Sequence, residues 1–287
     1  MTRLLQISDM HFGTEQPDVI AALTALSRKK NPDVLVVSGD ITQRATRQQF
    51  SCAKAFCDSL GIAQTISLPG NHDIPLFNLF SRVVRPYAAY RRAFGHALEP
   101  QLLTPSLCVL TVNTTRWWRH KNGEVSKAQI ERVCRQLSRA SARQLRIVVV
   151  HQPVHVLRPQ DEHDRLRGWQ AAVRAWAAAG ADIVMGGHIH LPYVCELSST
   201  VSGLDRRLWC VQAGTAVSSR IRREAPNSVN LIEFKVATGD LHCSVERWDY
   251  EKVGGKFELA HTSMLNLQRE GIEQHGQHIQ PDPLLFT

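Results

Sequence analysis

The sequence predicts an α/β protein in which an alternating α/β part precedes a mainly antiparallel β part. Strand-like and helix-like segments alternate as β-α-β-α-β over residues 3–68. The second of these strands, Val34–Val37, is apolar throughout, as expected for a parallel strand buried on both faces. After residue 190, strands and turns replace the helices.

The length and composition fit one main soluble domain with a sizeable core. The chain has 287 residues, of which 43% are hydrophobic. We expect residues 1–250 to form this domain, with cap-forming or substrate-side insertions at 76–122. Residues 251–287, rich in Gln and His, are expected to be a C-terminal tail or covering arm.

The charge and the cysteines restrict the partners and the compartment. The net charge of +8 favours an acidic partner such as a phosphorylated substrate, a nucleic acid or an anionic membrane surface, although solubility alone also explains it. Of these partners we expect a phosphodiester substrate, and the other two are less favoured. Seven scattered cysteines without a Cys-x-x-Cys pair indicate free thiols in a reducing compartment. With no export signal and no long apolar stretch, we expect a cytoplasmic protein, with peripheral membrane attachment left open. The oligomeric state stays open, a dimer included.

The first elements are defined by their apolar spacing and by their terminating residues. Strands are predicted at residues 3–8, 34–37 and 64–68. The helix at 17–30 begins at a proline and has apolar residues in helical spacing. The helix at about 46–60 is stopped by a glycine.

Each of these three strands is followed by polar residues, where α/β sheets usually keep their sites. In order, they are Asp9-Met10-His11, Gly39-Asp40 and Gly70-Asn71-His72-Asp73. Gly70 is expected to allow a tight turn. Taken alone, the third stretch is as compatible with an ordinary turn as with a site, since Gly, Asn and Asp all favour turns.

Residues 74–95 are apolar and basic together. One interpretation is a cap that offers Arg82 and Arg85 to a phosphate. Others are an interfacial membrane helix or an amphipathic surface helix with solvated charges, the most common of the three. The loop 116–121 carries Trp117-Trp118 between cations, which suits stacking on a base, lining a pocket rim or packing against the domain.

The second half repeats the pattern of strands followed by polar residues. Strands at 106–113, 146–150 and 181–185 alternate with helices at 126–140 and 169–179. The second of these strands leads into His151, and the third leads into Gly187-His188-Ile189-His190. The later strands are predicted at 193–197, 208–213, 229–236 and 241–248.

Eight polar residues therefore follow predicted strands at five separate ends. They are Asp9, His11, Asp40, Asn71, His72, His151, His188 and His190. A set of carboxylates and imidazoles without cysteine argues against a structural zinc site and for a catalytic metal with open positions. Eight groups are too many for one ion, so we expect two metals about 3.5 to 4 Å apart. Asp40, in the middle of the chain order, is the candidate bridging carboxylate.

These motifs resemble the calcineurin-like metallophosphoesterase superfamily. The matching residues are Asp9-Met10-His11, Gly39-Asp40, Gly70-Asn71-His72-Asp73, His151 and Gly187-His188-Ile189-His190. The resemblance implies a four-layer α/β/β/α fold in which two mixed sheets pack face to face with helices outside.

The resemblance also implies roles for the residues. One metal would lie between Asp9, His11, Asp40 and His190, and the other between Asp40, Asn71, His151 and His188. The metals would be Mn, Fe or Zn, with a bridging hydroxide as nucleophile. His72 would contact the phosphoryl oxygen or assist the leaving group, and Asp73 would orient His72.

Within the superfamily, the chain looks most similar to bacterial class III cyclic-nucleotide phosphodiesterase-type enzymes. The leading hypothesis is a metal-dependent phosphodiesterase acting on a phosphodiester, with cyclic nucleotides among the candidates. A phospholipid, a nucleotide-sugar lipid or a nucleic acid is the alternative substrate, and a binding scaffold is the non-enzymatic alternative. Arg220, with Arg222 and Arg223, forms either a phosphate contact or a solvated turn.

Overall fold

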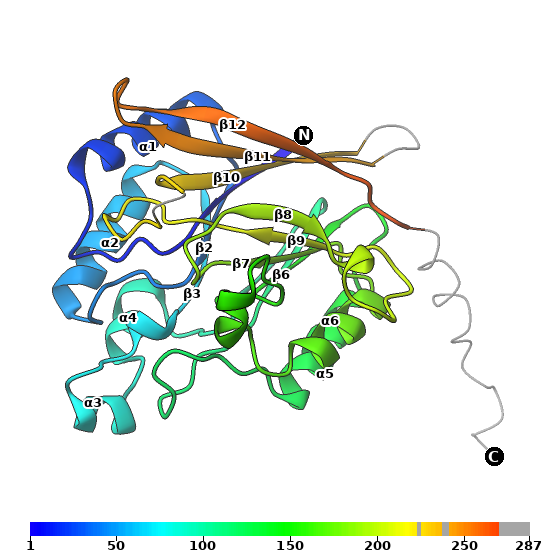
Figure 1. The fold of residues 1–287 in the computed structure, drawn as a ribbon, viewed down its shortest axis with the longest axis horizontal. Helices are drawn as coiled ribbons and strands as arrows, with labels where there is room; N and C mark the ends of the chain where they lie inside the picture. Colours follow the sequence, from blue (N-terminus) through cyan, green and yellow to red (C-terminus); the bar gives the residue numbers. More distant parts are fainter. Residues whose placement is uncertain (223–224, 237–240, 270–287) are drawn as a thin grey trace, which may run out of the picture.

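The computed structural model describes residues 1–222, 225–236 and 241–269 (Figure 1). It has four layers, with two mixed six-stranded sheets face to face and helices on the outer sides. The predicted fold is therefore confirmed. The two calls that fall on the remaining residues, Arg223 and the end of the tail at 270–287, lie outside this description.

The first sheet has the strand order β12-β11-β10-β1-β2-β3. Its strands are β1 (Thr2–Ile7), β2 (Val34–Ser38), β3 (Gln64–Leu68), β10 (Ser228–Val236), β11 (Leu241–Glu251) and β12 (Lys256–Leu265). Strands β1, β2 and β3 are parallel, and the remaining strands pair antiparallel. The carboxyl ends of the first three strands therefore meet at one edge.

The second sheet has the strand order β4-β5-β6-β7-β9-β8. Its strands are β4 (Gln101–Leu103), β5 (Leu107–Thr111), β6 (Leu145–Val149), β7 (Ile183–Gly186), β8 (Tyr193–Glu196) and β9 (Trp209–Gln212). Strands β5, β6, β7 and β9 are parallel, and β4 and β8 pair antiparallel at the two edges.

Strand β2 is apolar on both faces because each face packs into a different core. Val34 and Val36 point into the core between the two sheets, together with residues of β5, β6 and β7. Leu35 and Val37 point to the other side, into the core beneath the helices. Because side chains alternate along a strand, a strand in the middle of four layers needs apolar residues at every position.

Two pairs of helices cover the outer faces, and a third pair lies at the periphery (Figure 1). Helices α1 (Pro17–Lys30) and α2 (Arg47–Ser59) pack on the first sheet, and α5 (Lys127–Leu137) and α6 (Trp169–Ala178) pack on the second. Short helices α3 (Leu79–Val84) and α4 (Ala88–Phe94) follow β3. Three 3-10 turns complete the set, at Asn71–Asp73, Pro159–Asp164 and Leu197–Ser199.

Two segments differ from their expected form. Part of the expected tail is β12, which pairs with β11 and places Phe257 and Leu265 in the apolar cores. The expected insertion at 76–122 includes β4 and β5, which are integral to the second sheet. β12 pairs with the preceding strand β11, and β4 pairs with the following strand β5, each across a short turn, so both segments extend the sheets as local hairpins.

Within the described residues, no helix combines the length and the apolar character needed to cross a bilayer. The seven cysteines are free thiols, and Cys57, Cys108, Cys210 and Cys243 are buried.

Candidate metal centre

The five loops that follow β1, β2, β3, β6 and β7 converge between the carboxyl ends of the two sheets. Backbone hydrogen bonds hold neighbouring loops together: the N–H of Asp9 donates to Gly39 at 3.1 Å, and that of His11 donates to Asp40 at 3.0 Å. On the other sheet, the N–H of Gly187 donates to His151 at 2.9 Å. All eight polar residues singled out in the sequence lie on these loops.

Five of these residues adopt a left-handed backbone conformation that is rare for residues other than glycine. The φ angles are 51° for Asp9, 43° for His11, 47° for Asp40, 75° for His188 and 56° for His190. Such conformations cost energy and persist only where the surrounding structure holds them, which is typical of functional sites.

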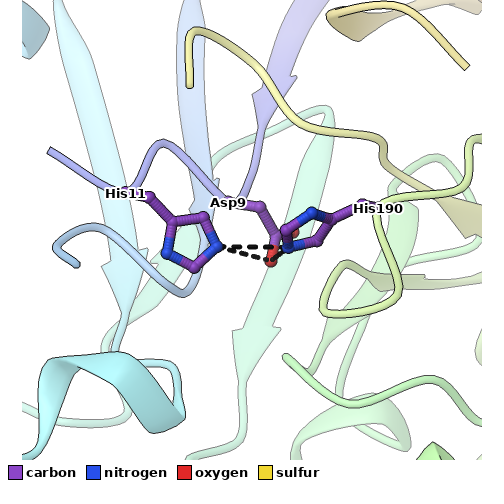
Figure 2. A group of neighbouring side chains, drawn as sticks. All are labelled: Asp9, His11 and His190. Atoms are coloured by element: carbon purple, nitrogen blue, oxygen red, sulfur yellow. Dashed lines mark hydrogen bonds and ion pairs between the residues drawn. The ribbon is translucent and has the colours of Figure 1, made fainter. Parts of the chain in front are cut away.

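Asp9, His11 and His190 form the first cluster of potential metal ligands (Figure 2). Oδ1 of Asp9 lies 3.8 Å from Nε2 of His11 and 3.3 Å from Nε2 of His190. The two histidine Nε2 atoms are 3.1 Å apart. Both rings therefore direct the same atom at the same carboxylate, which is the arrangement a cation needs.

Asp40, His151 and His188 form the second cluster, and Asn71 lies beside it. Nε2 of His151 is 3.3 Å from Oδ1 of Asp40 and 3.2 Å from Oδ1 of Asn71. The rings of His151 and His188 lie 5.1 Å apart between centroids. These four side chains come from four different loops, as in a site assembled by the fold.

Asp40 lies between the two clusters. Its Oδ1 faces His151 of the second cluster, and its Oδ2 lies 3.8 Å from Nε2 of His11 in the first. The backbone N–H of His72 donates to Oδ1 at 2.8 Å and fixes the carboxylate in this orientation. One oxygen towards each cluster is the geometry of a bridging ligand.

Backbone carbonyls accept hydrogen bonds from Nδ1 of two histidines, which leaves the Nε2 atoms of these rings available to a metal. Nδ1 of His151 donates to the carbonyl of Ser38 at 2.9 Å, and Nδ1 of His190 donates to the carbonyl of Arg220. A carbonyl oxygen only accepts, so in the neutral ring Nε2 keeps its lone pair. Metal-ligating histidines are usually oriented in this way.

The pKa shifts of His11, His188 and Asp9 favour the forms that bind a cation, whereas that of His151 favours a proton. Burial lowers the pKa of His11 to about 3 and lowers that of His188 as well. Burial would raise the pKa of Asp9, but His190 and its neighbours hold it at about 2. Burial would lower the pKa of His151, but Asp40 raises it to about 9, so a cation and a proton compete there.

Unpaired atoms support the same conclusion. Nδ1 of His188 is buried and has no hydrogen-bond partner in the described part of the chain, and Nε2 makes no hydrogen bond but lies 3.5 Å from Oδ1 of Asp164. Buried polar atoms without a partner are costly and mark a place for an ion or a water. The donor set of oxygens and imidazole nitrogens suits Mn, Fe or Zn.

His72 forms a further group of potential ligands with His11 and Asp40, and Arg220 lies beside it. Nδ1 of His72 donates to the carbonyl of Gln43 at 3.2 Å, which leaves Nε2 facing Nη1 of Arg220 at 3.3 Å. Arg220 also donates to Oε1 of Gln43 at 2.9 Å and approaches Nδ1 of His11 at 3.4 Å. The predicted substrate residue Arg220 therefore belongs to the site.

Asp73 has different partners from those expected. Its carboxylate accepts from the backbone N–H of Gly70 at 2.8 Å, Ile41 at 3.0 Å and Thr42 at 2.8 Å, and from the Thr42 hydroxyl at 2.9 Å. The ring of His72 is instead oriented by Gln43. Asp73 thus ties the loop after β2 to the loop after β3. Burial and the nearby Asp40 raise the pKa of Asp73 to about 7, although the backbone hydrogen bonds act to lower this pKa.

Two positions require glycine because neighbouring residues approach their backbone too closely for a side chain. Gly39 has a φ of 94°, and a side chain there would collide with the ring of His151. Gly70 has a φ of −97°, which any residue adopts, so the expected tight turn is not the reason for glycine. A Cβ atom at Gly70 would instead collide with the backbone N and Oδ1 of Asp40.

The other predicted substrate residues lie apart from the two clusters. Arg82 borders a cavity of 180 Å³ that His72 also lines, but its guanidinium donates to the carbonyls of Pro75 and Arg119. Arg85 is exposed and lines a neighbouring groove rather than the cavity of His72. Trp117 and Trp118 stack edge to face beside a separate groove of 620 Å³.

Sequence reasoning missed three residues near the site. Gln43 positions both His72 and Arg220, and Asp164 places Oδ1 3.5 Å from Nε2 of His188. His120 lines the cavity beside His72. The sequence could have indicated Gln43, because it lies three residues after Asp40 in the same loop. Asp164 lies in a long polar loop that carries no such signal.

Comparisons with known proteins agree with this geometry. The model of the calcineurin-like phosphoesterase family matches residues 2–192, whereas no curated protein matches the chain. A purple acid phosphatase from yellow lupin (Lupinus luteus) seeds is similar in structure, with 12% identity, a TM-score of 0.69 and coverage of 95% of this chain. This chain spans only 55% of the lupin chain.

A dimetal phosphatase from Danio rerio is also similar, with 12% identity and a TM-score of 0.64. The match covers 93% of this chain and 99% of that chain. At such low identity, both similarities concern the fold alone.

Proposed function

Because the chain belongs to the calcineurin-like phosphoesterase family, we propose that it is a phosphodiesterase that depends on two metal ions. The observation that carries this proposal is the orientation of Asp40, whose two oxygens face different histidine clusters. The substrate would be a phosphodiester, with cyclic nucleotides among the candidates.

The two clusters support the ligand sets that the family resemblance implies. One ion would be held by Asp9, His11, Asp40 and His190, and the other by Asp40, Asn71, His151 and His188. Two such cations neutralise phosphoryl oxygens and acidify a water, which supplies the nucleophile at neutral pH. Mn, Fe and Zn all accept these ligands.

The chain itself contributes two groups at the edge of the clusters. Arg220 points its guanidinium into the space between His11 and His72, where it can bind a phosphoryl oxygen through charge-assisted hydrogen bonds. Nε2 of His72 faces the same space and can exchange a proton with the leaving-group oxygen. Gln43 keeps both groups in place.

The test is hydrolysis by metal-reconstituted protein of bis(p-nitrophenyl) phosphate, a diester, against p-nitrophenyl phosphate, a monoester. We expect faster turnover of the diester and loss of this activity in Asp40→Ala and His188→Ala. Wild-type rates in either variant would refute the proposal. The monoester is included because the two structural neighbours are named as phosphatases.

A panel of natural substrates narrows the class. It contains cyclic AMP, a phospholipid, a nucleotide-sugar lipid and single-stranded DNA. Purified protein that binds no metal and hydrolyses none of them would support the binding scaffold instead. The amphiphilic substrates have one specific observation in their favour, the exposed apolar residues Leu76 and Phe77 beside the cavity of His72.

A further inference from the structure

Helix α3 buries a charged side chain and exposes its apolar ones. Its most buried side chain is Arg82, whose guanidinium donates to the carbonyls of Pro75 at 3.0 Å and Arg119 at 2.7 Å. Its apolar residues Leu79, Phe80, Val83 and Val84 are 70%, 76%, 53% and 53% exposed. A helix of a soluble domain normally buries its apolar face, so this face requires a partner.

The exposed face continues towards the metal centre. Leu76 and Phe77, which are 38% and 73% exposed, precede α3 and line the cavity that also contains His72. Figure 1 shows α3 at the periphery of the fold, away from both sheets. We call residues 76–84 the apolar edge. A surface that contacts the apolar edge would therefore lie next to the site.

The charged residues that line the two grooves beside the apolar edge are all arginines, apart from His96. The sequence has no Asp or Glu between Asp73 and Glu99. A groove of 740 Å³ between α2 and α3 is lined by Arg44, Arg47 and Arg85 together with Phe77 and Phe80, and it has no acidic lining residue. Next to it, Arg85, Arg91 and Arg92 border a second groove of 640 Å³.

We propose that the apolar edge and these arginines bind the surface of an anionic lipid bilayer. Side chains such as Leu79, Phe80 and Val83 enter the apolar part of the interface, and the arginines contact the lipid phosphates. Docking in this orientation brings the cavity of His72 onto the lipid surface. The proposal concerns binding and does not depend on the proposed function.

Charge and chemistry favour this partner over the alternatives. A second copy of the chain docked through the same face would bring arginines against arginines, which is unfavourable without counter-charges. Nucleic acid would meet the cations, but it offers no apolar phase to the aliphatic residues Leu79, Val83 and Val84. An anionic bilayer satisfies both kinds of residue at once.

The binding experiment is flotation of the full chain with vesicles. Vesicles of phosphatidylglycerol and phosphatidylcholine in equal parts should carry the protein, and phosphatidylcholine alone should not. Phe80→Ser/Val83→Ser should lower the bound fraction at least about fivefold. Arg85→Glu/Arg92→Glu should do the same and should reduce the salt dependence of binding.

A matched control changes apolar residues of similar exposure elsewhere. Val253 and Met264, which are 98% and 65% exposed, lie at the other end of the chain, and Val253→Ser/Met264→Ser should float as the wild type does. His188→Ala should also float normally, which separates vesicle binding from the fate of the proposed activity. Turnover of bis(p-nitrophenyl) phosphate and thermal unfolding show whether the α3 variants remain folded.

Three results would overturn the proposal. The wild type could fail to float with the anionic vesicles. The folded Phe80→Ser/Val83→Ser variant could float as well as the wild type. Finally, gel filtration could show a wild-type dimer that this variant converts to a monomer, without vesicle binding, which would assign the apolar edge to a second copy.

Discussion

The Nε2 atoms of His11 and His190 lie 3.1 Å apart, although 179 residues separate the two histidines in the sequence. His190 donates its Nδ1 proton to the carbonyl of Arg220, so its Nε2 presents a lone pair to His11. Two like groups at this distance repel each other unless a proton or a cation lies between them. The pair is therefore a candidate position for a metal ion, in competition with a proton, because Asp9 raises the pKa of His190 against the effect of burial.

Removing one ring of this pair should remove one ion. We expect His190→Ala to bind about one metal ion per chain instead of about two. Its hydrolysis of bis(p-nitrophenyl) phosphate should fall at least about 100-fold. Elemental analysis of reconstituted protein measures the ions, and the exposed His96 provides the control His96→Ala, which should keep both. An unchanged metal content in His190→Ala would contradict the assignment of this ligand.

Replacing Arg220 should impair turnover without removing metal. The guanidinium lies within 3.4 Å of His11 and His72 but is not among the ligands. We expect Arg220→Gln to retain both ions while kcat/KM falls about 100-fold, because a charge-assisted contact to the phosphoryl group is lost. Steady-state kinetics measure the effect. Arg207→Gln, at an exposed arginine, is the control and should behave as the wild type.

Asp73 should contribute strongly to stability, although it is not one of the candidate metal ligands. Its carboxylate accepts four hydrogen bonds, three of them from backbone N–H groups in two loops. Asp73→Ala leaves these donors unpaired, so we expect the free energy of unfolding to fall by about 3 kcal/mol. Urea unfolding measures this. The control Asp58→Ala removes an exposed pair with Lys54 and should change it by less than about 0.5 kcal/mol.

The buried thiols should make the fold sensitive to alkaline pH. Burial raises the pKa of Cys57 from 9.0 to about 12, so the folded value lies above that of the unfolded chain. The resulting stabilisation is complete below pH 9 and is lost as the pH rises towards 12. For this thiol the loss is about 1.4 kcal/mol per pH unit.

The measurement compares urea unfolding at pH 8 and at pH 10.5 for the wild type and Cys57→Ala. The variant should lose less stability between the two pH values, by an amount on the order of 2 kcal/mol. The exposed Cys52 provides the control Cys52→Ala, which should keep the wild-type dependence. An equal loss of stability in the wild type and both variants would show that ionisation of Cys57 does not cause the pH dependence.

The convergence of the candidate ligands could be predicted from the sequence because each one follows a strand with a visible burial pattern. Val34–Val37 is an example, since its continuous apolar run identifies a strand and places Asp40 just beyond its end. The partners of Asp73 could not be predicted in this way. They depend on how closely the loops after β2 and β3 approach, and the collision that a Cβ at Gly70 would make with Asp40 shows how close that is.

The four-layer arrangement was implied by the family resemblance. By itself, the sequence determined the alternating α/β part, the later β part, the ordered set of candidate ligands and the presence of an apolar, basic segment after β3. These follow from local spacing, because side chains alternate along strands and recur along helices. Only the tertiary structure decided that Asp40 turns one oxygen to each cluster and that α3 turns Arg82 inwards and Phe80 outwards. The direction in which a side chain points depends on contacts with residues far away in the chain, and spacing carries no information about those contacts.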